Sequence, residues 1–346
     1  MQPHMSEHPI SEYMEKVDRL MKDANHLLIV VHTNPDPDAI ATASALKYLV
    51  GKRYDVKTSI AFSGNIGRAE NRAMLKELNI YLKQISKISW EKYDRIALVD
   101  TQPGSGNNML PDNLKCDIVL DHHPPQNRVK AAFVLIEPDL GVLATMLIEW
   151  LMFLEYEIPP DLASALVYAI NSESQHLIRE VNQRDITAYL YVYIRSNLRK
   201  LARIMMPPLP RQYFLSISRA LREAKTYRNL ILAHLGDIDS ADIVSEMADF
   251  LVRHARISWS LCTGRFKNQL IISIRSRNAK AKAGELARKL VENSKTVGGH
   301  GMFAGGYIDV TGMKKNDIDI LENNLSKNFA QLLNYDNPEW KTLLPG

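Results

Sequence analysis

Three apolar runs in the first half of the chain each end in side chains that can bind a metal ion. These side chains are His32, Asp36 and Asp38 after the first run, Asp100 after the second, and Asp121, His122 and His123 after the third. Four carboxylates and three imidazoles gathered in one cleft would conflict electrostatically, and a pair of divalent cations resolves that conflict. The spacing therefore predicts metal-dependent chemistry.

These candidate ligands need a scaffold that brings distant segments to one place. The three runs are apolar on both faces, which is typical of covered strands in a parallel sheet. They are Leu27–Val31, Ile96–Val99 and Ile118–Leu120. Helical patterns are expected at Ala39–Leu49, Gly67–Leu78, Gly141–Leu154 and Pro160–Asn171. The alternation predicts an α/β fold, in which ligands bind beyond the carboxyl ends of the strands.

The second half of the chain predicts a separate, smaller α/β domain. Three prolines between Met206 and Pro210 break the helical pattern, and a helix-like run follows at Tyr213–Lys225. The expected organisation is a first domain at 1–205, a linker at 206–225 and a second domain at 226–346. The second domain is expected to contain a strand at Leu230–His234, a helix at Asp242–His254, a hairpin pairing Ile257–Thr263 with Gln269–Ser276, a helix at Ala281–Asn293, a strand near Tyr307–Val310 and a final helix.

Composition narrows the class of protein. The 346 residues have a net charge of +4, with a balance of −3 over residues 1–200 and +7 over residues 201–346. This asymmetry is either ordinary surface variation or a basic half that attracts a polyanion. The sequence has two cysteines, Cys116 and Cys262, which are far apart and have no metal-binding spacing. A cysteine-based zinc site and a disulfide scaffold are therefore excluded. The absence of a signal peptide and of a membrane-spanning run leads us to expect a cytoplasmic protein.

A cluster of glycines marks the second half. Five of the 16 glycines fall between Gly298 and Gly306, which predicts a loop where the backbone approaches something closely.

The motifs together resemble the DHH phosphoesterase family. The three strand-end segments read VVHTNPDPDAIATASAL, ALVDTQPG and IVLDHHPP, and TVGGHGMFAGGYI is similar to the glycine–histidine motif of the DHH-associated C-terminal domain. The resemblance is strongest to the two-domain nanoRNase and pAp phosphatase branch and its dinucleotide-hydrolysing relatives, with RecJ-type exonucleases as larger cousins.

The resemblance implies roles for individual residues. It assigns one metal to His32, Asp36 and Asp100, and a second metal to Asp38, Asp100 and His122. His123 would touch the scissile phosphate, and Asp121 would support the histidine pair. Oxygen and imidazole ligands suit Mn²⁺ best, with Mg²⁺, Fe²⁺ and Zn²⁺ as alternatives.

Two segments depart from the family pattern. In YAINSESQHL, Glu173 stands where the family has Asp, so Glu173 is either a retuned ligand or a sign of lost turnover. The segment 102–108 lacks the family's usual arginine and is either a plain turn or a flexible loop over the cleft.

In the second domain, the resemblance places the substrate's remote end on Arg275, Ser276, Gly298, Gly299 and His300. The implied activity is two-metal hydrolysis of pAp, nanoRNA or linear dinucleotides. The alternatives are a cyclic-dinucleotide phosphodiesterase, a polyphosphate hydrolase, or a nucleotide-binding module without turnover. Pyrophosphatases share only the first half of the pattern. No membrane partner is expected, and the oligomeric state stays open, a homodimer included.

Overall fold

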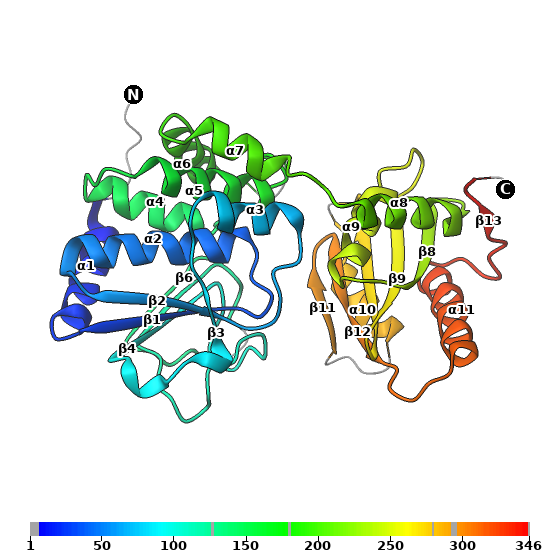
Figure 1. Cartoon of the computed structure of the whole chain (residues 1–346), viewed down its shortest axis with the longest axis horizontal. Helices are drawn as coiled ribbons and strands as arrows, with labels where there is room; N and C mark the ends of the chain where they lie inside the picture. Colours follow the sequence, from blue (N-terminus) through cyan, green and yellow to red (C-terminus); the bar gives the residue numbers. More distant parts are fainter. Residues whose placement is uncertain (1–6, 126–127, 179–180, 279, 292–295, 345–346) are drawn as a thin grey trace. The chain divides into compact units, whose positions relative to one another are not determined.

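The computed structural model describes residues 7–125, 128–178, 181–278, 280–291 and 296–344, shown in Figure 1. The chain forms two compact units that divide between Pro207 and Pro208, inside the proline-rich segment. Each unit has its own sheet and its own hydrophobic core.

The first unit is built on a six-stranded sheet in which every pairing is parallel, as expected. The strands are β1 (His26–Val31), β2 (Lys57–Phe62), β3 (Lys83–Gln84), β4 (Arg95–Val99), β5 (Ile118–Asp121) and β6 (Phe133–Ile136). Their order in the sheet is β3-β2-β1-β4-β5-β6. The order reverses between β1 and β4, which is where a parallel α/β sheet opens a crevice for ligands.

The sequence pattern missed β2, β3 and β6. Only the end of β2 is apolar, β3 has two residues, and β6 leaves Val134 37% exposed at the sheet edge. β2 and β3 therefore lack the continuous apolar run that identifies a central strand, whereas β6 has such a run, Phe133–Ile136, that the sequence interpretation did not assign.

Helices cover one face of the first sheet. They are α1 (Glu7–Met21), α2 (Pro37–Tyr54), α3 (Ala69–Glu77), α4 (Ala144–Phe153), α5 (Pro160–Glu173), α6 (Gln183–Tyr193) and α7 (Leu198–Met205). The opposite face packs against loops and the 3₁₀ turns η1 (Ile85–Lys87) and η2 (Trp90–Lys92). Both faces are buried, which explains the continuous apolar runs of the central strands.

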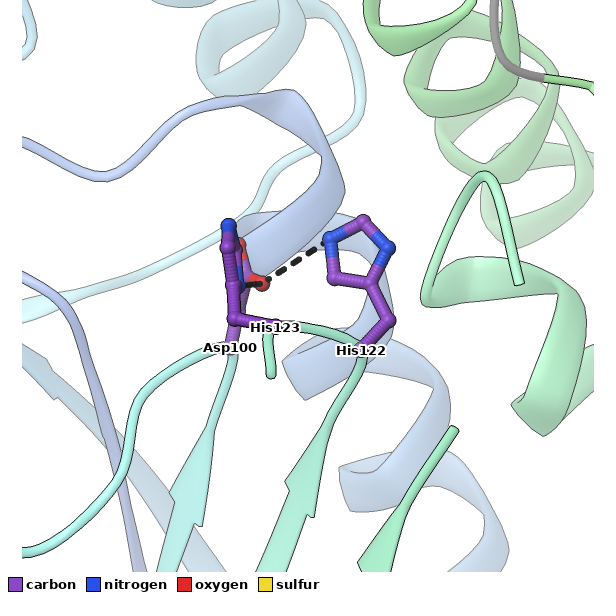
Figure 2. A group of neighbouring side chains, drawn as sticks. All are labelled: Asp100, His122 and His123. Carbon is purple, nitrogen blue, oxygen red and sulfur yellow. Dashed lines mark ion pairs between the residues drawn. The ribbon is translucent and has the colours of Figure 1, made fainter. Parts of the chain in front are cut away.

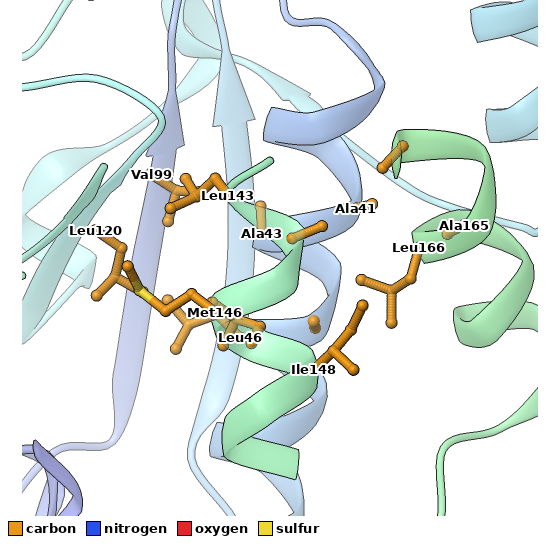
Figure 3. Close-up of a cluster of buried hydrophobic side chains, with 14 of the residues drawn as sticks. Ala41, Ala43, Leu46, Val99, Leu120, Leu143, Met146, Ile148, Ala165 and Leu166 are labelled. Atoms are coloured by element: carbon orange, nitrogen blue, oxygen red, sulfur yellow. The ribbon is translucent and has the colours of Figure 1, made fainter. Parts of the chain in front are cut away.

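The core beneath the candidate ligands joins the sheet to α2 and α4. Figure 3 shows Val99 and Leu120 from the sheet beside Leu46 of α2 and Met146 of α4. Each of these four residues is at most 1% exposed. Close packing of this kind fixes the strand ends that carry the candidate ligands.

The second unit has a seven-stranded mixed sheet in the order β11-β12-β10-β9-β8-β7-β13. Its strands are β7 (Lys225–Tyr227), β8 (Leu230–Asp237), β9 (Trp259–Phe266), β10 (Gln269–Ser276), β11 (Val297–His300), β12 (Phe303–Asp309) and β13 (Lys341–Thr342). Helices α8 (Arg211–Glu223) and α9 (Asp242–Leu251) pack on one face, and α10 (Ala283–Leu290) and α11 (Lys315–Leu332) pack on the other. This confirms that the C-terminal region forms a second α/β unit with its own mixed sheet.

The expected linker at 206–225 differs from the structure. Helix α8 packs against β8, and Ala220 and Ala224 are fully buried in the core that α8 shares with α9. Arg219 donates to the carbonyls of Leu235 and Asp237, which ties α8 to the end of β8. The helix therefore belongs to the second unit, and only the proline-rich segment connects the two.

The glycine cluster forms a hairpin where a loop was expected. β11 and β12 pair antiparallel, with Gly299 opposite Ala304. Gly299 has φ +147°, and a Cβ on Gly284 of α10 would lie 1.9 Å from the Gly299 carbonyl oxygen. The close backbone approach was thus correctly expected, but it is made by the protein's own helix.

In the part of the chain that the structure describes, no helix combines the length and the hydropathy needed to cross a membrane.

Candidate metal centre

The candidate ligands converge at the carboxyl ends of three neighbouring strands. His32 follows β1, Asp100 follows β4, and Asp121 ends β5, with His122 and His123 next in the chain. Asp36 is the N-cap of α2, and Asp38 lies in its first turn. Residues from three segments of the chain therefore lie around one point of the sheet edge.

Asp100 is the centre of this arrangement (Figure 2). Its Oδ1 atom lies 3.5 Å from Nε2 of His122 and 3.4 Å from Nδ1 of His123. Its Oδ2 atom lies 3.5 Å from Nε2 of His32. Two sets of side chains present ligand atoms within 4.8 Å of one another: Asp100 with His122 and His123, and Asp100 with His32 and Asp36. Asp100 is thus common to both sets.

The backbone of Asp100 is itself unusual. Its φ is +59°, a left-handed conformation that a non-glycine residue rarely adopts and that Asp tolerates better than most. The side chain is 3% exposed, and Oδ1 is the sole buried side-chain polar atom without a hydrogen-bond partner in the described ranges. Strain and an unsatisfied carboxylate oxygen at one residue are typical of functional sites.

Two histidines are oriented by backbone carbonyls. Nδ1 of His32 lies 3.0 Å from the Thr33 carbonyl oxygen, and Nδ1 of His122 lies 3.0 Å from that of Leu140. Nδ1 is therefore assigned as the donor in both rings, because a carbonyl can only accept. This leaves the Nε2 lone pair of each ring directed at Asp100, an arrangement commonly found for metal-binding histidines.

Asp38 is held by the start of α4. Its Oδ2 accepts the backbone N–H of Leu143 at 2.7 Å, and its Oδ1 accepts that of Ala144 at 2.8 Å. Oδ2 also lies 4.0 Å from Nε2 of His122. Asp38 thus borders the centre and is outside the two sets that share Asp100. No pattern in the sequence indicated its partnership with α4.

Asp121 supports the histidine pair and brings in a residue that the sequence interpretation missed. Oδ1 of Asp121 lies 2.9 Å from Nδ1 of His123 and accepts the backbone N–H groups of His122 and His123. Oδ2 accepts from the Gln102 amide at 2.7 Å, and the same amide donates to the His123 carbonyl at 2.9 Å. Gln102 is buried, so the segment 102–108 contains more than a plain turn.

The charges of the site are unbalanced. Burial, and then the charge of Asp100, raises the pKa of Asp38 to about 7. Burial alone would lower the pKa of His122, but the Asp100 and Asp38 carboxylates raise it to about 9. In the same way the hydrogen-bonded Asp100 and Asp36 raise the pKa of His32 well above its usual range, against the effect of burial. Without a bound cation, the negative charge of the carboxylates therefore favours the protonated forms of Asp38, His122 and His32.

Glu173 ends α5 beside this centre. Burial, and then the charges of Asp36, Asp38 and Asp100, raise its pKa to about 8. Those couplings place its carboxylate in the field of the candidate ligands. Among the described side chains, Glu173 belongs to neither of the two sets that share Asp100.

The donor set fits divalent cations. Carboxylate oxygens and imidazole nitrogens without thiolate are ligands typical of Mn²⁺, Mg²⁺ and related ions. A cation beside Asp100 would satisfy its unpartnered Oδ1 and balance the carboxylates that raise the pKa values of their neighbours.

The residues of the second unit that were expected to bind the substrate differ in their exposure to solvent. Arg275 and Ser276 are 8% and 6% exposed. Arg275 pairs with Asp249 at 2.5 Å and donates to Ser273 and to the Ala304 carbonyl, and its guanidinium lies 5.0 Å from the Phe303 ring centroid. The expected contact of Arg275 with a phosphate therefore competes with an internal ion pair.

The glycines of the β11–β12 hairpin are more accessible to solvent than Arg275 and Ser276. Ser276 accepts from the backbone of Asn278 and donates to the Ser258 carbonyl. Gly298 and Gly299 are exposed on β11, the edge strand. In backbone register, Arg275 and His300 both pair with Phe303. The side chain of His300 lies outside the part of the chain that the structure describes.

The parallel sheet and its carboxylate–imidazole centre define an α/β protein with a metal-competent site. Residues 26–170 match the DHH family, N-terminal domain. This match includes all seven strand-end candidates.

Curated relatives cover this chain to different extents. An uncharacterized protein of Methanocaldococcus jannaschii is 35% identical over 286 residues, which are 82% of this chain and 58% of that protein. A probable manganese-dependent inorganic pyrophosphatase of Lactobacillus gasseri is 32% identical over 150 residues, which are 42% of this chain and 47% of that protein. The chain thus spans about half the length of these relatives.

Solved structures share the fold. An exopolyphosphatase-related protein of Bacteroides fragilis has a TM-score of 0.73 at 14% identity, covering 96% of this chain and all of that one. RecJ of Thermus thermophilus, solved in complex with Mn²⁺, has a TM-score of 0.52 at 12% identity, covering 97% of this chain and 57% of RecJ.

Proposed function

We propose that the chain is a phosphoric ester hydrolase that uses two divalent cations, with Mn²⁺ preferred, to cleave short nucleotide substrates such as pAp, nanoRNA or linear dinucleotides. The observation that carries this proposal is the position of Asp100, whose carboxylate is common to two sets of ligand atoms and has an unpartnered buried oxygen. The manganese-dependent relatives from Lactobacillus support the choice of metal.

The ligands divide around Asp100. His32 and Asp36 would hold one cation with it, and His122 and Asp38 would hold the other, with Glu173 as an additional carboxylate. When bound, such cations neutralise phosphate charge and lower the pKa of water to about 7.

The chain's own residues would then position the substrate and hold protons. The hydrogen bond from His123 to Asp121 raises the pKa of His123, so its ring keeps a proton more readily than a free imidazole. That ring is 47% exposed at the edge of the centre, where a protonated imidazole can donate to a phosphate oxygen. Asp121 and Gln102 fix its orientation.

A second candidate is hydrolysis of inorganic pyrophosphate, which the Lactobacillus relatives favour. A panel containing pAp, a linear dinucleotide, a cyclic dinucleotide, short RNA, polyphosphate and pyrophosphate, each with Mn²⁺, separates these candidates. We expect pAp and linear dinucleotides to be cleaved fastest. Faster cleavage of pyrophosphate than of every nucleotide would transfer the assignment to that reaction.

The metal part of the proposal has its own test. Mn²⁺ should raise the melting temperature of the wild type, because a ligand at 100 times its Kd stabilises the folded state by about 2.7 kcal/mol. Asp100→Asn should abolish this shift and the hydrolysis together, since Asn keeps the left-handed backbone but is a poorer ligand. An unchanged Mn²⁺-dependent shift in this variant would contradict the shared-ligand arrangement.

Glu173 decides between an enzyme and a binding module that has lost turnover. Glu173→Gln should lower both Mn²⁺ affinity and turnover if the carboxylate is a ligand. Two metals per chain in the wild type with measurable turnover support the enzyme. One metal or none, with tight nucleotide binding and no turnover, supports the binding module.

A further inference from the structure

A cavity of about 440 Å³ opens on the first unit, lined by α2, the start of α5 and the segment that follows α3. This volume is within the usual range for small-molecule sites. Its lining excludes the candidate metal ligands, so it is a separate feature of the molecule. Nothing in the proposed hydrolysis requires it.

The floor of the cavity is formed by apolar side chains, and a backbone hydrogen bond closes the turn beside it. Ile60 of β2, Leu78 and Ala165 of α5 are buried, and they line the cavity. Ile80 donates its backbone N–H to the Leu75 carbonyl at 3.0 Å, which closes the turn after α3. The side chain of Tyr81 is 78% exposed at the rim. The walls therefore offer aliphatic and aromatic surface to an apolar body.

The charge at the rim is positive. Lys47 and Lys52 of α2 line the cavity, and neither has an ion-pair partner among the residues that the structure describes. Asp161 also lines it, but its carboxylate is paired with Lys200 at 2.7 Å. The net charge presented to a ligand is therefore that of the two lysines.

Gly51 keeps the cavity open on the α2 side. A Cβ at this position would meet nothing within 4 Å, so no packing contact requires glycine here. Glycine is also a poor helix former. The position can therefore accept a side chain that fills the cavity without disturbing the fold.

We propose that this cavity binds a small amphipathic anion, with an aromatic or aliphatic body on the apolar floor and an acidic head group near Lys47 and Lys52. The volume limits the occupant to a small molecule, and the unpaired lysines specify its charge. The site is independent of the proposed hydrolase activity.

Two matched fluorescent probes test the proposal. 8-Anilinonaphthalene-1-sulfonate carries the anionic head, and N-phenyl-1-naphthylamine is the same body without the sulfonate. The sulfonate should bind the full-length wild type at one site per chain and more tightly than the neutral probe. Equal affinity for the two probes would overturn the assignment of an anion.

Variants locate the binding. Gly51→Leu should weaken binding of both probes at least 10-fold while the melting temperature stays equal or rises, because leucine favours a helix. Gly51→Ala is the matched control and should change binding less than 3-fold. Full sulfonate binding by Gly51→Leu would place the site elsewhere and overturn the proposal.

Charge variants complete the test. Lys47→Ala and Lys52→Ala should each weaken sulfonate binding about 2- to 5-fold, as for exposed charge pairs, and leave the neutral probe unaffected. Lys115→Ala, an exposed lysine before β5, should change neither. If sedimentation velocity shows that the sulfonate instead dissociates a dimer, the occupant is a second copy of the chain and the small-anion proposal fails.

Discussion

The backbone N–H of Leu143 donates to the carboxylate of Asp38 at 2.7 Å, across 105 positions of the sequence. With the bond from Ala144, both oxygens of Asp38 accept from the first residues of α4. Helix N-termini carry a partial positive charge and favour a carboxylate in this place. Asp38 therefore joins α2 to α4 in addition to facing the candidate metal centre.

This double role predicts a stability effect without any metal. Asp38→Asn would turn an amide donor toward a backbone donor and should lower the free energy of unfolding by about 1–3 kcal/mol. Asp112→Asn is the control, because Asp112 is an exposed aspartate before β5 and surface substitutions usually change stability little. Its loss should stay below about 1 kcal/mol. Urea unfolding in EDTA measures both, and equal losses would contradict the account.

The loop between β1 and α2, which carries Asp36, contacts the loop that follows β2. Asn34 has φ +57°, and its side chain accepts the backbone N–H of Asn65 at 2.7 Å. A Cβ on Gly64, whose φ is +77°, would lie 2.2 Å from Oδ1 of Asn34. The loops after β1 and β2 are therefore interlocked at this glycine.

Gly64→Ala should displace Asn34 and with it the ligand loop. We expect Mn²⁺ affinity to fall about 10- to 100-fold, as for other residues that support metal ligands. Gly104→Ala is the control, since Gly104 has φ +75° but open space around the added Cβ. It should cost only the backbone strain, about 1 kcal/mol, without loss of Mn²⁺ affinity. Isothermal titration calorimetry distinguishes the two, and equal affinities would argue against the interlock.

The sequence predicted the parallel sheet and the convergence of the strand-end candidate ligands because both depend on local patterns. An apolar run ending in Asp or His can be read directly, and topology then gathers the ends. The contacts of Asp38 with α4 and of Gln102 with Asp121 depend on the tertiary fold and have no local signal. The same reason explains why α8 was expected in a linker: its apolar face is visible in the sequence, but the strand that it covers is not.

Arg275 illustrates this limit within the second unit. A strand-end arginine indicates a phosphate contact, yet Asp249 of α9, 26 positions earlier, occupies its guanidinium. Arg275→Ala should therefore destabilise the second unit by about 1–3 kcal/mol, because it leaves the half-buried Asp249 carboxylate and the Ala304 carbonyl without this donor. Hydrogen exchange of amides in β9 and β10 reports that loss. A variant with unchanged exchange but weaker pAp cleavage would restore Arg275 as a direct substrate contact.

His234, in the second unit, is a buried histidine far in the sequence from the candidate metal ligands. In the second unit, Nδ1 of His234 lies 2.7 Å from Oγ of Thr263, and Nε2 lies 2.8 Å from Oγ of Ser326. Burial, and then the charge of Lys225, lowers the pKa of His234 to about 4. The carboxylate of Glu322 lies 3.6 Å from the ring, and burial raises its own pKa. The folded unit thus holds His234 neutral.

The sign of the pH dependence follows from that shift. Between pH 6.5 and pH 4 the unfolded chain binds a proton at His234 that the folded chain does not. The stability contributed by neutral His234 is therefore complete above about pH 6.5 and is lost as the pH falls toward 4, by about 3 kcal/mol in total. Glu322 acts in the opposite direction, because its raised pKa favours the folded state at low pH and loses this effect as the pH rises above about 4.5.

A comparison with His234→Gln isolates the histidine, because Glu322 is present in both proteins. The wild type should lose more stability than the variant on acidification from pH 6.5 to pH 4.5, as measured by hydrogen exchange in β8. NMR titration of the histidine Cε1–H signals should show one resonance, absent from the variant, that titrates near pH 4. Titration of that resonance near pH 6.5 would mean that water or a charged partner stabilises the imidazolium, and the predicted difference in stability would vanish with it.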